Sequence, residues 1–373
     1  MARAQHKIFG TDYGFNALSS LSAEEIIYNK VYAVTYPDGF KVTFQKKRWG
    51  GYELYLATTL RVLDTIFNKY AIVGNSNDTS DNTALMLANS NQFAYVSDEV
   101  TIKGECYVPN GMFKPYHTAK VPDVKQYRQS PEKIPALRNI DSVVKWLSEQ
   151  KAHQNHNLWT SPPKINNSFS NEPLIISADT ANIDGVLEGN IIITARTIFV
   201  KNTARLSNII LIGGSIFFEA YFKGQLQCYA SDTITTGKRS LFVYPSILGV
   251  IRTYGENLHS GKASILHVED STEIQGDIFG YQLNKKSKGN IFVNIEDESK
   301  IIGGVYSSGY LKVRGQVFGR VICTRLLENI NNTVQENLLY KVELNNDSLP
   351  YFYTFSTIFP EKNVSAKVIK WVQ

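Results

Sequence analysis

Two stretches of the chain decide the fold: VEDSTEIQGDIF at residues 268–279 and IEDESKIIGGVY at residues 295–306. They match position by position at an offset of 27 residues, and both contain the unit Ile/Val-x-Gly-x-Ile/Val-Phe/Tyr. A third copy of this unit is VRGQVF at residues 313–318, and looser copies are IKGECY at 102–107 and IDGVL at 183–187. Self-similarity of this kind is typical of proteins built from stacked structural repeats.

The repeat predicts a mainly β protein with a parallel β-helix, a solenoid in which each short strand pairs with the coils before and after it. Inward-pointing aliphatic side chains then form one column, so Ile274, Ile301 and Val313 are expected to neighbour one another. Glycine permits sharp corners because it adopts positive φ without a steric penalty. The alternative is a β-sandwich whose strands share a motif. An 18-residue spacing supports the solenoid: Ile193 and Leu211, Ile198 and Ile216, Val200 and Phe218.

Four parts are predicted along the chain: an N-terminal α+β unit (1–108), a proline-rich connector with one helix (109–172), the β-helix (173–328) and a C-terminal group of strands that could form a cap (329–373). The copy at 102–107 predicts that the N-terminal part adds a coil to the same solenoid.

Local patterns place the smaller elements. A capping box that starts at Ser22 predicts a helix over about 22–30, with Ile26 and Ile27 buried. Alternation over 31–45, interrupted by Pro37-Asp38-Gly39, predicts a β-hairpin. Asp141 is placed to cap a helix that extends to about His153. Residues 154–171 are rich in Asn, Ser and Pro and are predicted to form an exposed loop.

Composition limits the classes of function. The formal net charge is +5, and the basic residues are scattered, with their densest cluster at Lys46-Lys47-Arg48. A nucleic-acid partner is therefore not expected, because such proteins usually carry a basic stripe with stacking aromatics. The three cysteines, Cys106, Cys228 and Cys323, lie far apart in apolar runs and are predicted to be small buried hydrophobic residues.

No stretch reaches the roughly 18 to 20 apolar residues that a membrane-spanning helix needs. Residues 1–6, MARAQH, also lack the apolar region of a signal peptide. The expectation is either a cytosolic protein or a form from which a targeting segment has been removed.

Two resemblances can be named. Residues 274–323, with their glycine-punctuated Ile/Val units, resemble the bactofilin type of polymer-forming β-helix. Four segments in order, KRWGGYE at 47–53, residues 84–109, YPSILG at 244–249 and residues 303–324, are similar to a group of uncharacterised cell-envelope proteins of Bacteroidota.

Proteins of that group carry an N-terminal membrane anchor followed by a β-helix. The resemblance implies a periplasmic or membrane-anchored location, other envelope proteins as partners, and membrane contact only through an anchor segment absent from this chain. It implies no reaction and brings no catalytic residues.

Sequence motifs for catalysis are missing: the chain has no G-x-S-x-G elbow, phosphate-binding loop or H-E-x-x-H helix. His153 and His156 are three residues apart, but no third ligand accompanies them, so no metal site is expected. No catalytic, cofactor-binding or metal-binding residue is therefore assigned.

Stacked carboxylates are the strongest argument for an enzyme. Asp270 and Asp297 occupy equivalent positions in the repeat, and Glu296 and Glu298 would share one face of a strand. Such groups could bind an ion or act as an acid–base pair, as in β-helix enzymes that cleave polysaccharides. The simpler interpretation is that they are acidic corner residues that keep the solenoid surface soluble.

A binding surface is the other candidate, because solenoids bind partners through extended faces. The sequence therefore predicts a non-enzymatic structural, assembly or binding scaffold of a bacterial cell envelope. The alternatives are a carbohydrate-active β-helix enzyme and a polymer-forming cytoskeletal or pilus-associated element. Aromatic and charged residues that could contact a protein or a glycan are Arg205, Tyr221, Phe222, Lys223, Tyr229 and Tyr254.

Overall fold

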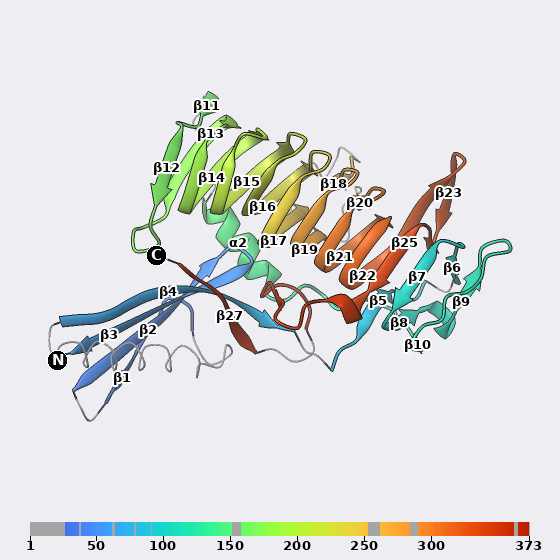
Figure 1. Cartoon of the computed structure of the whole chain (residues 1–373), viewed down its shortest axis with the longest axis horizontal. Helices are drawn as coiled ribbons and strands as arrows, with labels where there is room; N and C mark the ends of the chain where they lie inside the picture. Colours follow the sequence, from blue (N-terminus) through green and yellow to red (C-terminus); the bar gives the residue numbers. More distant parts are fainter. Residues whose placement is uncertain are drawn as a thin grey trace.

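The computed structural model describes residues 27–36, 39–61, 64–77, 80–90, 92–150, 158–252, 262–283, 290–361 and 365–372. The protein is mainly β. A long row of parallel strands occupies most of the molecule, and a twisted antiparallel sheet lies beneath one end of it (Figure 1). The helix α2 (Ile140–Gln150) lies between the two, so the predicted connector helix is confirmed.

The row of parallel strands is called the parallel stack below. Each of its main strands pairs in parallel with a strand from the next pass of the chain. Its strands are β11 (Leu158–Thr160), β12 (Lys164–Asn167), β13 (Leu174–Ile183), β14 (Val186–Val200), β15 (Arg205–Phe218), β16 (Lys223–Thr235), β17 (Leu241–Arg252), β18 (Ser264–Val268), β19 (Glu273–Gln282), β20 (Ile291–Ile295), β21 (Lys300–Val313) and β22 (Gly315–Ile330).

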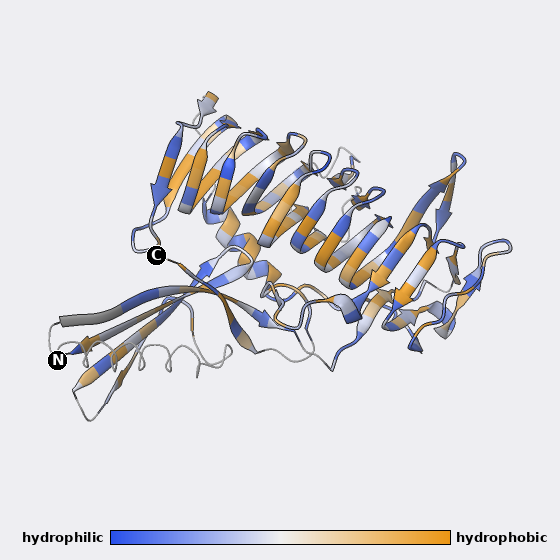
Figure 2. Ribbon diagram, viewed as in Figure 1, coloured by the Kyte–Doolittle hydropathy of each residue, from blue (hydrophilic) through white to orange (hydrophobic). Residues whose placement is uncertain are grey.

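The register of the stack confirms the predicted spacings. All three pairs of residues 18 apart are direct partners of β14 and β15. The 27-residue offset likewise places Ile274 opposite Ile301 and Val268 opposite Ile295. These aliphatic side chains are buried in one cluster that extends through the stack, and Figure 2 shows the hydrophobic residues recurring from strand to strand.

The third copy of the repeat is displaced by four residues from the predicted alignment. Ile301 faces Val317, whereas Val313 faces Ile295. The passage from β21 to β22 advances the register by only 16 residues, so the true equivalent of residues 301–306 is 317–322. The glycine column follows this register: Gly276, Gly303 and Gly319 have φ of +156°, +144° and +150°.

The copy at residues 102–107 joins the stack, as predicted. Ile102 pairs in parallel with Leu344, whose strand pairs with β22, and Cys106 pairs with Leu85, which itself faces Val321. The strands at this end are β5 (Thr83–Leu87), β7 (Val100–Lys103), β8 (Glu105–Val108), β10 (Gln126–Gln129) and β25 (Val342–Asn345). Smaller elements beside them are β6 (Ala94–Val96), η1 (Pro109–Gly111), β9 (Phe113–Pro115), β23 (Thr333–Glu336), β24 (Leu338–Leu339) and η2 (Asn346–Ser348).

The predicted exposed loop at 154–171 is wrong for its described part. Within it, β11 pairs in parallel with β13, and β12 pairs in parallel with β14. Trp159 and Ile165 pack against the core of the stack, which explains why this polar segment extends it. Asparagine and proline mask the pattern because they lie at the corners, where Pro162 and Pro163 separate the two strands.

The antiparallel sheet confirms the predicted hairpin. Its strands are β1 (Val31–Thr35), β2 (Phe40–Trp49), β3 (Tyr52–Arg61) and β4 (Asp64–Ser76), with β26 (Thr354–Phe355) and β27 (Ala366–Val372) added from the C-terminal part. Hydrogen bonding thus joins the N-terminal and C-terminal parts of the chain. The predicted helix at 22–30 falls mainly outside the described residues, and 27–30 form a turn in which Ile27 is 62% exposed, so the expected burial of Ile27 is wrong.

A second apolar core joins the outer face of the stack to the rest of the molecule. Helix α2 contributes Val143 and Leu147, spaced four residues apart and therefore on one face. Among the described residues, no helix is long and apolar enough to span a bilayer. The other members include Tyr229, Phe279 and Tyr306 of the stack, Trp49 and Tyr52 of the antiparallel sheet, and Tyr353, Phe355 and Phe359 of the C-terminal part.

All three cysteines are buried without a disulfide, as predicted. Burial raises the pKa of the Cys106 thiol to about 12. Burial also raises the pKa of Cys228 and of Cys323. Because the thiolate is the nucleophilic form, these side chains act as apolar core residues.

Candidate binding pocket

The equivalent aspartates lie on successive corners of the stack, where Ser271 N donates to the carbonyl oxygen of Asp297 (3.1 Å). Each carboxylate has a basic partner from a neighbouring coil. Asp270 Oδ2 lies 3.0 Å from Lys238 Nζ, and Asp297 Oδ1 lies 3.3 Å from Arg314 Nη1. The described residues contain no group of three potential metal ligands. These aspartates therefore behave as corner residues in ion pairs.

Glu296 and Glu298 do not share a strand face, contrary to the expectation from the sequence. Both lie in the turn between β20 and β21, because β20 ends at Ile295. Glu296 Oε2 accepts from Lys312 Nζ at 2.7 Å, and Glu298 Oε2 accepts from Ser271 Oγ at 2.9 Å. The two carboxylates have separate partners and form no acid–base pair.

The predicted aromatic binding surface is only partly exposed. Phe222 and Tyr229 are 0% and 2% exposed and belong to the cores, because their positions point inward or toward the antiparallel sheet. Arg205, Tyr221 and Lys223 are exposed, while Tyr254, like His153 and His156, lies outside the described residues. This set therefore does not form one surface.

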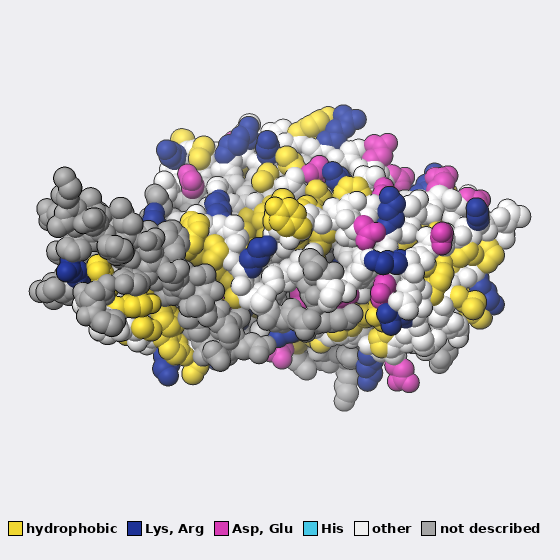
Figure 3. Space-filling model, turned by 60° about the horizontal axis from the view of Figure 1, so that its bottom comes forward, with side chains coloured by type: hydrophobic (Ala, Val, Ile, Leu, Met, Phe, Trp, Pro, Cys, Tyr) yellow, Lys and Arg dark blue, Asp and Glu magenta, His cyan; other side chains and the backbone are white. Residues whose placement is uncertain are grey.

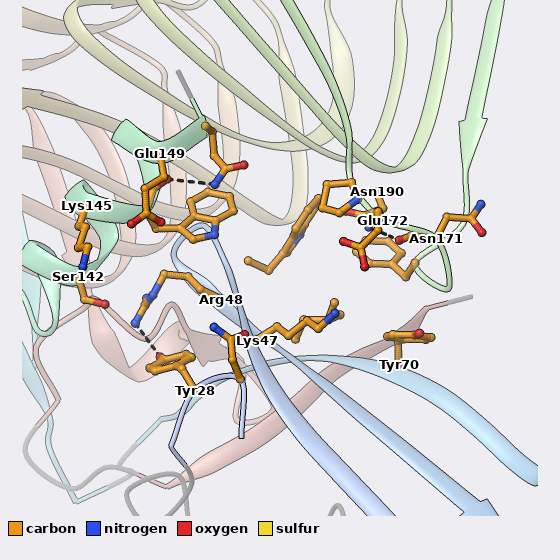
Figure 4. Close-up of a pocket in the computed structure, with 17 residues that line it drawn as sticks. Tyr28, Lys47, Arg48, Tyr70, Ser142, Lys145, Glu149, Asn171, Glu172 and Asn190 are labelled. Atoms are coloured by element: carbon orange, nitrogen blue, oxygen red, sulfur yellow. Dashed lines mark hydrogen bonds between the residues drawn. The ribbon is translucent and has the colours of Figure 1, made fainter. Parts of the chain in front are cut away.

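A pocket with a volume of about 470 Å³ lies where the antiparallel sheet, α2 and the first coils of the stack meet (Figure 4). Its size is in the range of pockets that hold small ligands. Aromatic, amide and charged groups from segments far apart in the chain line it: Tyr28, Asn29, Lys47, Arg48, Trp49, Leu54, Tyr70, Ser142, Lys145, Trp146, Glu149, Gln150, Phe169, Asn171, Glu172, Pro173 and Asn190.

The turn that follows Arg48 is fixed to the stack by buried hydrogen bonds. Gly51 N donates to Tyr229 Oη (2.7 Å) and Gln227 Oε1 (2.9 Å), and Gln227 Nε2 donates to the Trp49 carbonyl (3.1 Å). The approach is so close that a Cβ on Gly50 would lie 2.3 Å from Gln227 Oε1. These contacts hold the end of β2, and with it Arg48, in a fixed position against the pocket.

Arg48 supplies a donor without a protein acceptor. Its Nη2 donates to Tyr28 Oη at 2.7 Å, and its guanidinium lies 4.6 Å from the centre of the Tyr28 ring. Tyr28 Oη in turn donates to Glu53 Oε1 (2.5 Å). Burial, followed by the charge of Glu53, raises the pKa of Tyr28 well above its ordinary value, so the phenol stays neutral. Nη1 of Arg48 is buried and has no hydrogen-bond partner in the described part of the chain.

Asn190 supplies the complementary acceptor. Its side chain belongs to β14 and is 3% exposed. Nδ2 donates to the Asn171 carbonyl at 2.9 Å, which fixes the orientation of the amide and leaves Oδ1 as the opposite atom. That oxygen finds no donor among the described residues. A buried polar atom without a partner costs about 1–3 kcal/mol, so a ligand that donates to it would gain correspondingly.

A second pocket, of about 380 Å³, lies beside the buried side chain of Arg320. Arg320 Nη1 donates to Glu361 Oε2 (2.8 Å) and to Asp81 Oδ2 (3.3 Å). Burial raises the pKa of Glu361 to about 7, against the opposing charge of Arg320, and Asp81 raises it further. Since Arg320 bonds both carboxylates and joins three parts of the chain, this cluster is interpreted as a structural junction.

Sequence reasoning missed the first pocket. Its one visible signal was the basic cluster at 46–48, interpreted as a solvated surface, whereas Lys46 is paired with Glu53 at 2.9 Å and Arg48 lines the pocket. No family model matches the chain, and no curated protein or solved structure is significantly similar to it.

Proposed function

We propose that this chain is a non-enzymatic binding scaffold whose platform is a parallel β-helix. The parallel pairings with offsets of 16 to 27 residues, the apolar column inside the stack and the glycine column at one corner support the solenoid. A solenoid gives a rigid face on which other elements can be fixed. Here the fixed elements are the antiparallel sheet and α2, and the pocket lies between them and the stack.

The observation that carries the binding role is the pair of unsatisfied atoms in the pocket, Arg48 Nη1 and Asn190 Oδ1. They are held in place by the protein and offer one donor and one acceptor to a polar ligand. Two buried groups of opposite hydrogen-bonding character, in a cavity of suitable size, are typical of a site that orients a small molecule.

An enzyme remains the second candidate because two carboxylates flank the same pocket. Figure 4 shows Glu149 and Glu172 on opposite sides of it, an arrangement that glycoside hydrolysis requires. Both side chains are exposed, and no hydrogen bond in the described part of the chain orients either carboxylate. A catalytic acid must be held within reach of its proton acceptor, so binding is favoured over cleavage.

The proposed location is the bacterial cell envelope, with other envelope proteins as partners. It is supported by the resemblance of residues 47–53, 84–109, 244–249 and 303–324 to envelope proteins of Bacteroidota. The visible surface is compatible with protein contacts rather than long-range attraction to a polyanion. On the face in Figure 3, the acidic and basic side chains of the described residues are interspersed toward the β22 end.

One experiment tests both parts of the proposal. Cells that express the full-length protein are fractionated, and the purified protein is incubated with envelope polysaccharides while new reducing ends are measured. We expect recovery with the envelope fraction and no product above the buffer blank. Recovery with soluble cytosolic proteins would contradict the location. Product that disappears in both Glu149→Gln and Glu172→Gln would replace the binding role with hydrolysis.

A further inference from the structure

We infer that the pocket between β2, α2 and the first coils binds an acidic saccharide, a sugar ring that carries a carboxylate. This inference deepens the proposed binding role and rests on it. Three features of the lining support it: the cations, the fixed acceptor and the aromatic rings.

The cations select an anionic group. Lys47, Arg48 and Lys145 line the pocket, and the buried Nη1 of Arg48 has no acceptor in the described part of the chain. A guanidinium favours a carboxylate because the two groups form short, charge-assisted hydrogen bonds. The carboxylates of Glu149 and Glu172 would repel a ligand that is anionic throughout. A single negative group near Arg48, with neutral atoms elsewhere, fits this distribution of charge.

The fixed acceptor selects a hydroxyl or amide donor. Asn190 Oδ1 is buried, and the hydrogen bond from its Nδ2 to Asn171 prevents the amide from offering a donor instead. Glu149 and Glu172 add further acceptors toward the outside of the pocket (Figure 4). Sugar hydroxyls donate to such groups, and several acceptors around one cavity suit a ligand with several hydroxyls.

The aromatic rings provide an apolar surface for the ring of a sugar. Tyr28, Tyr70 and Trp146 line the pocket and are partly exposed, whereas Trp49 and Phe169 form its buried side, with ring centres 5.1 Å apart. Aromatic rings with one apolar face and one polar edge suit ligands that are themselves amphipathic. A uronic acid presents C–H groups, hydroxyls and one carboxylate from a single ring, which matches all three features.

Titration of the full chain with oligogalacturonic acid and with a neutral galacto-oligosaccharide of equal length tests this inference by calorimetry. We expect the acidic sugar to bind more tightly, with affinity that falls as salt increases. Arg48→Met should weaken the acidic sugar by roughly 10- to 100-fold, the range for a lost hydrogen bond to a charged group. Trp146→Ala, a change at a partly exposed position, should weaken both sugars.

Arg196→Met is the matched control, because Arg196 is exposed and pairs with Asp179 on the stack. It should leave both affinities unchanged, and circular dichroism establishes that each variant is folded. Equal affinity for the two sugars would overturn the acidic assignment. Absence of binding by either sugar, or preferential binding of an acidic peptide that depends on Arg48, would overturn the saccharide assignment. The proposed scaffold role fails separately, through the fractionation and product assays.

Discussion

Replacement of Gly303 with valine is expected to abolish stable folding, with a loss of at least about 4 kcal/mol in the free energy of unfolding. Gly303 has φ of +144°, which a β-branched residue adopts only at high cost. A Cβ at this position would lie 2.2 Å from Tyr353 Oη and 2.3 Å from the Gly276 carbonyl oxygen. The backbone of the preceding coil cannot move aside without breaking the parallel register.

The same substitution would disrupt the connection between the stack and the C-terminal part. Tyr353 Oη donates to the buried carboxylate of Asp277 at 2.9 Å, which also accepts from Ser356 N (2.6 Å) and Gly304 N (3.0 Å). Burial raises the pKa of Asp277, and these donors oppose the increase. Displacement of Tyr353 removes one of the hydrogen bonds that stabilise this buried carboxylate.

Gly39→Val is the matched control. Gly39 also has positive φ, +84°, but a Cβ there would meet no atom within 4 Å. It should cost only about 1–2 kcal/mol, from backbone strain alone. Chemical denaturation followed by circular dichroism compares the two variants. Similar losses would mean that Gly303 is not at a crowded corner and that the coil spacing is wrong.

Replacement of Arg320 with methionine is expected to cost about 3–5 kcal/mol near neutral pH, because it leaves buried carboxylates without their cation. Arg320 is 1% exposed and bonds Glu361, Asp81 and Asn77, the last at 2.8 Å from Nη2. Loss of the side chain would therefore loosen the junction of the stack, the segment after β4 and the C-terminal part.

The effect should depend on pH. In the wild-type protein the pKa of Glu361 is about 7, above its ordinary 4.5, so the folded state holds a proton that the unfolded state releases between these values. This contribution to stability is present below pH 4.5 and is lost as pH rises toward 7. Arg320 lowers this pKa, so its removal raises the pKa further. The difference in stability between the two proteins should therefore grow from about pH 5 to about pH 8.

Urea denaturation at about pH 5 and about pH 8 measures this difference. Arg196→Met again serves as the control, since its exposed ion pair should contribute no more than about 1 kcal/mol at either pH. A loss in Arg320→Met that matches this control, or one that is larger at the lower pH, would contradict the interpretation of a buried charged junction.

The sequence was sufficient to predict the stacking of the coils but not every register within it. Ile193 and Leu211 could be paired in advance because inward aliphatic residues must recur at each coil. Val313 was misplaced because the unit at 313–318 resembles the repeat, whereas the backbone uses 317–322. Only hydrogen bonding between coils distinguishes two similar units that overlap in one stretch of chain.

The pocket could not be predicted, because it exists only after the N-terminal sheet has docked. Arg48 and Asn190 are far apart in the chain, and neither belongs to a motif. The docking depends on Gly50 and Gly51, whose close approach to Gln227 and Tyr229 is invisible without the fold. A local pattern indicates which side of an element is buried, but not which other element covers it.

Disulfide formation between outward-facing positions of adjacent coils tests the proposed solenoid most directly. Lys300 is the parallel partner of both Glu273 and Gln316. Adjacent strands are about 4.8 Å apart, within disulfide reach, whereas positions two strands apart are not. The native cysteines are buried and should not compete.

Under mild oxidation, we predict that Lys300→Cys/Gln316→Cys forms an intramolecular disulfide, detected by peptide mass spectrometry, and that Glu273→Cys/Gln316→Cys does not. Efficient closure of the second pair, or failure of the first in a folded protein, would contradict coil-on-coil stacking.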